Sequence, residues 1–335
     1  MNFFLVILTL FCCSTAKSQV GDSLAYKLYK DKVVLYSDLG YSSSPFTIKD
    51  NFLGGYKKIK FKHNQKVILG FGAAYKWFAL RIGFALPQTL RPAGKFGNPN
   101  YFDLGVSFTV KKMYWDINLR NYLGYAIQDA NRWDDSLTTL KPNAIEPRIL
   151  NFDLSINSWY FKSDQFRMQS VFGRVGEFKR TIGTWYFKST LNLFGVGNGL
   201  DPIVPLELID TTETKSSANS IATLDVGVVP GYAYVYRQGF WQASVFAGLG
   251  GVVQSKFVSA DGITRGLLGL APRVDFRFVA GYSKPKYFFW LTTEFDIKSV
   301  SHRELKYGGA YHLIRLVGGV RLDKKEKAKK GKNKV

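Results

Sequence analysis

Residues 101–125, YFDLGVSFTVKKMYWDINLRNYLGY, contain two rows of alternating apolar residues on either side of a short basic turn. The rows are Phe102, Leu104, Val106, Phe108 and Val110, and then Trp115, Ile117, Leu119, Leu123 and Tyr125. Polar residues such as Asp103, Asp116 and Arg120 stand between them. Because successive side chains of a strand point to opposite faces, the stretch predicts an antiparallel hairpin with one apolar and one polar face.

The same alternation recurs along the chain, and no segment of comparable length shows a helical period. It is found in residues 67–75, 78–86, 150–156, 185–193, 226–234, 268–278, 287–295 and 314–322. So many strands of similar length predict an all-β protein.

Tryptophan placement favours a membrane barrel over a soluble β protein. Five tryptophans lie in or near expected short turns, usually beside other aromatic residues: Trp77, Trp115, Trp159, Trp241 and Trp290. Aromatic side chains gather at the two interfaces of a membrane barrel because their rings are apolar and their tips are polar. We therefore expect these five to form an interface girdle, and the apolar strand faces to contact lipid.

The expected architecture is a transmembrane, antiparallel, up-and-down β-barrel of about 14 strands, with about 12 as the alternative. Short turns are expected near Lys76, 111–113, 162–164, 237–239 and 283–285, and long links at 87–100, 126–148, 255–265 and 297–309. An extra strand through residues 203–208 would give an even strand count, while residues 33–62 stay ambiguous. Outer-membrane barrels place short turns in the periplasm and long loops outside the cell.

The polar strand faces carry charges of both signs, which we expect to line the lumen. The candidates are Arg81, Asp103, Asp116, Arg120, Asp153, Lys188, Asp225, Arg273, Asp275, Arg277 and Glu294. Arg273 and Arg277 flank Asp275 on one face, which leaves a local positive excess unless Glu294 or Asp296 on the next strand supplies a counter-ion. An open lumen would then attract small anions, whereas a closed one would hold these residues as a buried ion network.

The two ends of the chain predict export and a solvated tail. Residues 1–18 form an apolar run followed by small residues, which is typical of a cleaved signal peptide. Residues 19–32 would then be a periplasmic segment, 33–322 the barrel and 323–335 a disordered lysine-rich tail. The only cysteines, Cys12 and Cys13, lie in the signal segment, so the mature chain would hold no disulfide.

Several stretches resemble a family of bacterial outer-membrane β-barrel proteins that carries only a domain-of-unknown-function label. They are residues 36–50, 60–80, 166–187 and 230–241. The resemblance implies an outer-membrane barrel and brings no assigned activity, ligand or catalytic residue. His63 and Asn64 stand where that family's first hairpin would turn through Pro-Asn.

No catalytic, metal or cofactor signature is found in the sequence. The three histidines, His63, His302 and His312, are widely spaced, and a metal site needs three or four converging ligands. We expect no enzyme activity, with an outer-membrane hydrolase as a remote alternative that would need a serine, a histidine and a third group in contact.

Charge and location together indicate the expected partners. The formal net charge is +21, and an exported basic chain meets membrane lipid and lipopolysaccharide rather than nucleic acid. The tail could also bind an acidic periplasmic or cell-wall partner. Two functions remain open: a narrow pore or transport barrel with a charged, hydrated lumen, which we favour, and a non-conducting structural or interaction barrel that acts through its loops and tail.

Overall fold

The computed structural model describes residues 24–55, 57–64, 66–128, 145–210 and 216–323. The strands are β1 Tyr26–Leu28, β2 Lys32–Ser43, β3 Phe46–Lys49, β4 Ile59–Lys62, β5 Lys66–Tyr75, β6 Phe78–Thr89, β7 Asn100–Val110, β8 Met113–Ile127, β9 Ile145–Phe161, β10 Gly176–Phe178, β11 Ile182–Gly197, β12 Ala218–Gln238, β13 Trp241–Ala260, β14 Ile263–Ser283, β15 Tyr287–His302 and β16 Leu305–Asp323. The short helices are η1 Leu53–Gly55, α2 Ala93–Phe96, α3 Met168–Val171 and η4 Leu206–Leu208. The predicted signal peptide and all but the first residue of the predicted tail lie outside the described residues.

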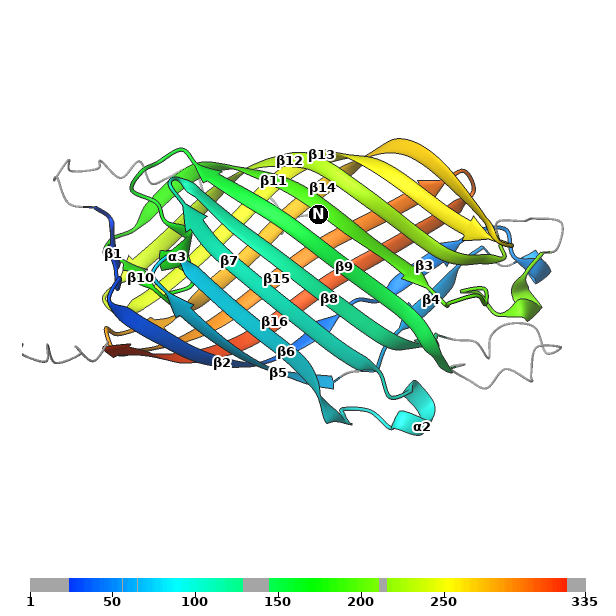
Figure 1. The fold of residues 1–335 in the computed structure, drawn as a ribbon, viewed down its shortest axis with the longest axis horizontal. Coiled ribbons are helices and arrows are strands. Elements are labelled where there is room, and N and C mark those ends of the chain that lie inside the picture. Colours follow the sequence, from blue (N-terminus) through cyan, green and yellow to red (C-terminus); the bar gives the residue numbers. More distant parts are fainter. Residues whose placement is uncertain (1–23, 56, 65, 129–144, 211–215, 324–335) are drawn as a thin grey trace, which may run out of the picture.

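Fourteen of these strands form one antiparallel sheet that closes on itself, which confirms the predicted up-and-down barrel (Figure 1). The ring runs from β2 through β5, β6, β7, β8, β9, β11, β12, β13, β14, β15 and β16, and returns to β2. The remaining two strands, β3 and β4, form a bridge from β16 to β8. No helix in the described part of the chain is long and apolar enough to cross a membrane.

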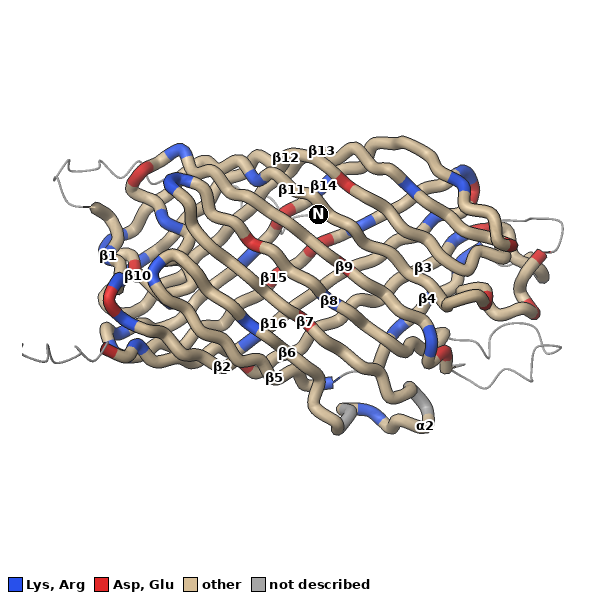
Figure 2. Tube along the Cα trace, viewed as in Figure 1, with Lys and Arg blue, Asp and Glu red and all other residues tan. Residues whose placement is uncertain are grey.

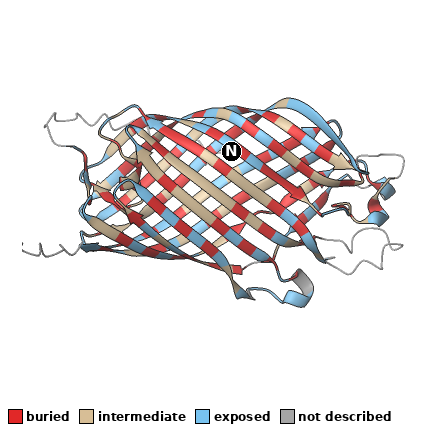
Figure 3. Ribbon diagram, in the orientation of Figure 1, coloured by how far each residue is buried: buried red, intermediate tan, exposed pale blue. Residues whose placement is uncertain are grey.

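Burial alternates along the strands, as the sequence pattern requires (Figure 3). Large apolar side chains such as Phe71, Leu80, Val226 and Leu316 point outward and are exposed. An apolar outer face on a closed barrel is the surface that lipid contacts in an outer-membrane protein. The protein is therefore an outer-membrane-type barrel.

The two ends of the barrel differ, and we name them by their connections. The turn end holds the tight turns at Lys76, Lys111, Gly239 and residues 284–286, and the loop end holds α2 and the links after β8 and β11. In Figure 1 the turn end is on the left, with β1, β10 and α3, and the loop end is on the right. The rule for outer-membrane barrels predicts that the turn end faces the periplasm.

Two of the expected long links are tight turns instead, and this is a correction. The strands β13 and β14 extend to a turn at Asp261 and Gly262, and β15 and β16 extend to a turn at Arg303. Asp261 and Gly262 both have positive φ, 51° and 77°, which is the geometry of the type I′ hairpin turn that Asp-Gly favours. The Asp-Gly signal was present in the sequence and was not used.

Two further expectations fail between β9 and β12. Residues 162–164 do not turn the chain directly into the next barrel strand, because residues 162–181 leave the wall to form α3 and β10. The expected strand through residues 203–208 is also absent, since these residues form a loop that ends in η4. Both segments pack inside the lumen, so their apolar residues are buried without belonging to the wall.

The closed ring gives a simple biochemical prediction. Membrane-extracted protein should migrate differently on a denaturing gel before and after boiling, because a barrel with a continuous hydrogen-bonded ring resists detergent unfolding. Circular dichroism of the unboiled sample should show a β spectrum. A helical spectrum, or recovery of the protein in the soluble periplasmic fraction, would contradict the fold.

Candidate functional site

The inward-facing rows of several wall strands pass from apolar to charged and back to apolar side chains. On β8 the row runs from Tyr114 through Asp116 and Arg120 to Tyr122, and on β15 it runs from Trp290 through Glu294 to Val300. The lumen is therefore built in three layers, namely a turn-end plug, a charged belt and a loop-end plug.

The turn-end plug is an apolar cluster that includes residues from outside the wall. Phe166, Val171 and Phe178 come from the segment between β9 and β11, and they pack with wall residues such as Trp159 and Phe246. Trp159 is completely buried, and Phe246 lies edge-on to it with ring centroids 5.9 Å apart. The segment thus fills the turn end of the barrel.

Arginine and glutamine side chains of the wall donate hydrogen bonds to the backbone of this segment. Arg321 on β16 donates to the carbonyl oxygens of Gly173, Arg174 and Lys284 and to the Ser283 hydroxyl. Gln242 on β13 donates to the carbonyl oxygens of Ser170 and Val171, at 3.3 and 3.1 Å. Backbone carbonyls that would otherwise be orphaned inside the barrel are satisfied in this way.

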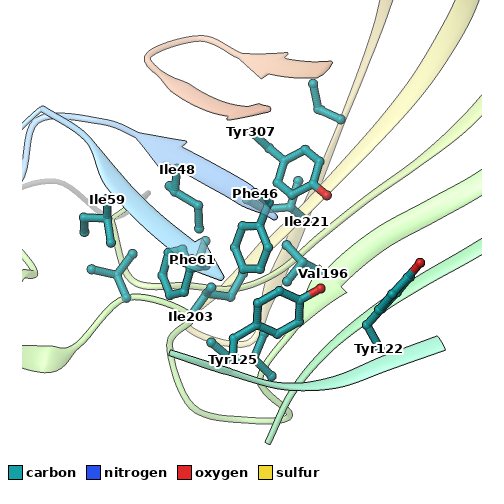
Figure 4. Packing of buried hydrophobic residues seen from close by; sticks show 14 of the residues in the cluster. Phe46, Ile48, Ile59, Phe61, Tyr122, Tyr125, Val196, Ile203, Ile221 and Tyr307 are labelled. Carbon is teal, nitrogen blue, oxygen red and sulfur yellow. The ribbon is translucent and has the colours of Figure 1, made fainter. Parts of the chain in front are cut away.

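The loop-end plug is a second cluster, built around the β3–β4 bridge (Figure 4). Phe46 and Phe61 stack with ring centroids 4.5 Å apart, and Tyr125 meets Phe46 edge-on at 4.9 Å. Ile203 and Leu208 reach the same cluster from the loop before β12. The loop end of the lumen is thus closed by apolar packing.

The charged belt lies between the plugs and contains fifteen charged side chains among the described residues. Figure 2 shows charged residues in the middle of the barrel as well as at its ends. The cations are Arg81, Arg120, Lys188, Arg273, Arg277, Lys298 and Arg315, and the carboxylates are Asp38, Asp103, Asp116, Asp153, Asp225, Asp275, Glu294 and Asp296. Every member has an oppositely charged partner within the belt. Seven cations against eight carboxylates leave the belt close to neutral.

The tightest part of the belt is centred on Arg81. Its Nε and Nη2 donate to the two carboxylate oxygens of Asp38 at 2.6 and 2.7 Å, and its Nη1 donates to Asp103 at 2.5 Å. The Tyr101 hydroxyl donates to the other oxygen of Asp103 at 2.8 Å. A Cβ at Gly70 would lie 2.5 Å from both Arg81 and Asp38, so this inward glycine makes room for the ion cluster.

A second centre is Glu294, which receives three arginines from three other strands. Arg120 and Arg277 each lie 3.4 Å from its carboxylate, and Arg315 lies 3.9 Å from it. Arg277 also reaches Asp116 at 3.4 Å. This arrangement links β8, β14, β15 and β16 across the lumen.

All eleven residues predicted to line the lumen belong to this belt. The structure adds Asp38, Lys298 and Arg315, and it places Asp296 beside Arg273 at 3.7 Å, as the counter-ion argument anticipated. The expected positive excess around Asp275 does not arise, because Asp275 pairs with Lys188 at 2.7 Å while Arg273 and Arg277 have other carboxylates. The sequence could have predicted Lys298 as a lumen residue, because it lies four positions after Glu294 and even spacing places both on the same face of a strand.

The girdle prediction needs a correction for two tryptophans. Trp77 and Trp241 are exposed on the outer face and Trp115 is half-buried, but Trp159 and Trp290 are 0% and 2% exposed inside the lumen. Their spacing from Asp153 and Glu294 is even, so a period of two directs them inward with those carboxylates. Trp185 is exposed on the outer face near the turn end and was not among the five.

The space left inside the belt is small. The cavity lined by Asn118, Ser155, Thr190, Glu294 and Asp296 has a volume of about 50 Å³, which holds only a few water molecules. Among the described residues, no group of three or more His, Cys, Asp or Glu side chains is placed to hold a metal ion.

The comparison with protein families identifies a family that has no assigned activity. The family described as a domain of unknown function (DUF4421) matches residues 21–306, which confirms the resemblance seen in the sequence. No curated protein matches the chain in sequence.

Three solved structures resemble the fold at low identity. They are the outer membrane protease OmpT from Escherichia coli (8% identity, 90% of this chain and 99% of that one, TM-score 0.38), the COG4313 outer membrane channel from Pseudomonas putida F1 (12%, 91% and 100%, 0.40) and the Pseudomonas putida toluene transporter TodX (9%, 88% and 91%, 0.28). At these identities and TM-scores the likeness does not extend to function.

Removing one member of the Arg81 cluster should be costly. Arg81→Met leaves Asp38 and Asp103 buried without a counter-ion, so the free energy of unfolding should fall by about 3–5 kcal/mol. Arg148→Met is the matched control, because the Arg148–Asp201 pair is exposed and such pairs contribute about 0–1 kcal/mol. Urea titration of the folded barrels measures both. Equal midpoints for the two variants would contradict the burial of the cluster.

Protonation of His63, which lies between β4 and β5, should weaken the loop-end plug. Its Nε2 accepts from the Ser44 N–H at 3.1 Å and its Nδ1 donates to the Asn64 carbonyl at 2.8 Å, so the neutral ring satisfies both contacts. Burial lowers the pKa of His63 to about 4. Because the unfolded chain takes up the proton first, the parent should lose stability as the pH falls from about 6.5 towards 4.

His63→Gln retains a donor and an acceptor but does not titrate. The difference in urea midpoint between pH 7.5 and pH 5 should therefore be smaller in this variant than in the parent. An identical difference in both proteins would show that His63 does not carry this part of the pH dependence.

Proposed function

We propose that this chain, which belongs to the DUF4421 family, is a non-conducting outer-membrane barrel that acts as a structural or interaction protein of the envelope. The observation that supports this most is the layered lumen, in which a self-neutralised belt lies between two apolar plugs. A water-filled pore needs charges that face solvent, whereas the charges of this belt face one another. The proposal reverses the preference for a pore that inward glycine and serine residues suggested in the sequence.

The rest of the proposal concerns the surfaces that remain for binding. A closed lumen leaves the loop end, the lipid-facing wall and the lysine-rich tail as places where partners can bind. The cleaved signal peptide and the tail's acidic partner remain predictions, since both segments lie outside the described residues.

A gated pore is the second candidate, and one observation favours it. The turn-end plug belongs to an insertion between β9 and β11 whose strand β10 pairs with β1 and not with a wall strand. Side chains, among them Arg321, Gln242 and Arg167, hydrogen-bond it to the wall. A plug fastened by a few side chains can leave without breaking the ring. On this view the closed lumen would be the resting state of a pore.

Planar-bilayer conductance separates the two candidates. Folded parent protein should give no current steps, and Arg321→Met should also stay silent because the belt still blocks the lumen. A hollowed variant serves as the matched control: it lacks residues 164–180 of the turn-end plug and residues 46–61 and 200–208 of the loop-end plug, and it carries Arg120→Ser, Arg277→Ser and Glu294→Ser. This variant should conduct.

Insertion of all three proteins is checked first by flotation with vesicles and by gel mobility. Stable steps from the parent would overturn the non-conducting proposal. Steps from Arg321→Met alone would establish the gated pore.

A further inference from the structure

Two neighbouring strands of the barrel wall, β14 and β15, are paired by backbone hydrogen bonds along only part of their length. Backbone pairing between β14 and β15 begins beside their turn, at Ser283 and Phe288, and ends at Phe276 and Phe295. Beyond that point β14 continues to Ile263 and β15 continues to His302. In the described residues each strand keeps its other neighbour, β13 or β16, along this whole stretch. In this register residues 269–275 of β14 face residues 296–302 of β15 without pairing, and residues 263–268 of β14 extend past the end of β15. We call the unpaired stretch, residues 263–275 of β14 and 296–302 of β15, the seam.

The sequence contains a physical reason for the seam. If the register continued, Asp275 would face Asp296 and Arg273 would face Lys298, and directly opposed like charges destabilise a strand pair. The next position on β14 is Pro272, which has no N–H to donate to a ladder. The pairing therefore stops where these residues begin.

Side chains replace the missing ladder on the β15 edge. Arg273 Nη1 donates to the Ile297 carbonyl at 3.2 Å, Gln254 Nε2 to the Ser299 carbonyl at 3.0 Å and Lys256 Nζ to the Ser301 carbonyl at 2.8 Å. Gln254 and Lys256 belong to β13, so they reach past β14 to the next strand but one. The junction is held by three side-chain hydrogen bonds instead of a continuous backbone ladder.

Lys256 is the exceptional member of this set. It is only 6% exposed, yet within the described parts of the chain it forms no ion pair, and its ammonium has a single neutral partner. A Cβ at Gly269 would lie 2.6 Å from Lys256 Nζ, which places the ammonium against the unpaired part of β14. A buried cation without a carboxylate is costly, and an anion would satisfy it.

The outer face of the seam is strongly apolar. Leu268 and Leu270 are 74% and 81% exposed, and Val274 and Ile297 flank them on the two strands. These side chains point away from the lumen on the lipid-facing surface. An apolar outer face and a buried cation thus lie at the same junction.

We propose that the wall opens laterally at the seam and there binds a membrane lipid with an anionic head group. The head group takes the place of the Ser301 carbonyl at Lys256, and the acyl chain lies along Leu268, Leu270, Val274 and Ile297. Lipid binding at the seam does not require a pore through the barrel. The lipid site can therefore be tested independently of the proposed non-conducting function.

Photolabelling tests the site directly. Folded protein is placed in phosphatidylcholine vesicles that contain a trace of phosphatidylglycerol with a diazirine in its acyl chain, and labelled peptides are mapped after irradiation. Label should concentrate in residues 263–276 and 295–302. Lys256→Met should reduce it about tenfold, the scale of one lost charge-assisted hydrogen bond, while Lys256→Arg should retain it.

Lys306→Met is the matched control, because it removes an exposed lysine on β16 and should leave the labelling unchanged. A second arm uses Val274→Cys with Ile297→Cys, bridged by a bifunctional thiol reagent. Closing the seam in this way should abolish the label, and the bridge is selective because the sequence has no cysteine beyond Cys12 and Cys13.

Three results would overturn the proposal. Label spread evenly around the wall would show no site, and equal labelling by a diazirine phosphatidylcholine would show that the head group is not recognised. Full competition by inorganic phosphate would assign Lys256 to a free anion instead of a lipid. Gel mobility before boiling confirms that each variant is folded.

Discussion

The closed ring of backbone hydrogen bonds is the constraint on which the rest of this structure depends. In hydrocarbon every backbone N–H and C=O needs an internal partner, so an edge that lacks a ladder must be satisfied by side chains, as the carbonyls of Ile297, Ser299 and Ser301 are. Alternate side chains then point into a lumen that must be filled or hydrated. Here it is filled, by insertions from both ends and by a network of charges between them.

The belt shows how charges can be buried when each one lies beside a charge of opposite sign. Moving an ion out of water is expensive, and it is tolerated when opposite charges and hydrogen bonds surround it. The Arg81 cluster meets this condition through bidentate geometry, and Glu294 meets it by facing three arginines. Where the sequence would instead oppose like charges, at Asp275 and Asp296 and at Arg273 and Lys298, the wall itself separates and the charges find partners elsewhere. The seam is thus a consequence of the same electrostatics that hold the belt together.

Sequence reasoning reached the wall and the belt because both follow from a period of two. Residues 101–125 form the predicted hairpin, and the eleven predicted lumen charges all lie in the belt. Sequence reasoning was wrong where strand alternation outweighed the nearness of a residue to a turn, and where a turn motif was not used. Trp159 and Trp290 lie near turns, but their even spacing from inward carboxylates places them on the lumen face. The Asp261–Gly262 turn lies within a stretch that was expected to be a long loop.

The plugs could not be predicted from strand pattern, because β10, α3 and η4 are short segments whose burial depends on the shape of the lumen around them. Predicting the seam requires the register of β14 against β15, because that register determines which charged residues would face each other. Neither property is visible in one strand alone. The argument for a pore rested on inward glycines, but a glycine such as Gly70 leaves room that Arg81 and Asp38 occupy, so strand pattern alone does not show whether the lumen is empty.

Thiol accessibility in the middle of the lumen is the most direct measure of whether the barrel is closed. Ser155 lines the small cavity of the belt, and Asp261 lies in the exposed turn at the loop end. In folded Ser155→Cys protein, a charged membrane-impermeant thiol reagent should leave the new cysteine unmodified for as long as the barrel stays folded, while Asp261→Cys reacts at once. Prompt modification of Ser155→Cys in the folded barrel would show that water and solutes reach the belt, and it would contradict the closed lumen.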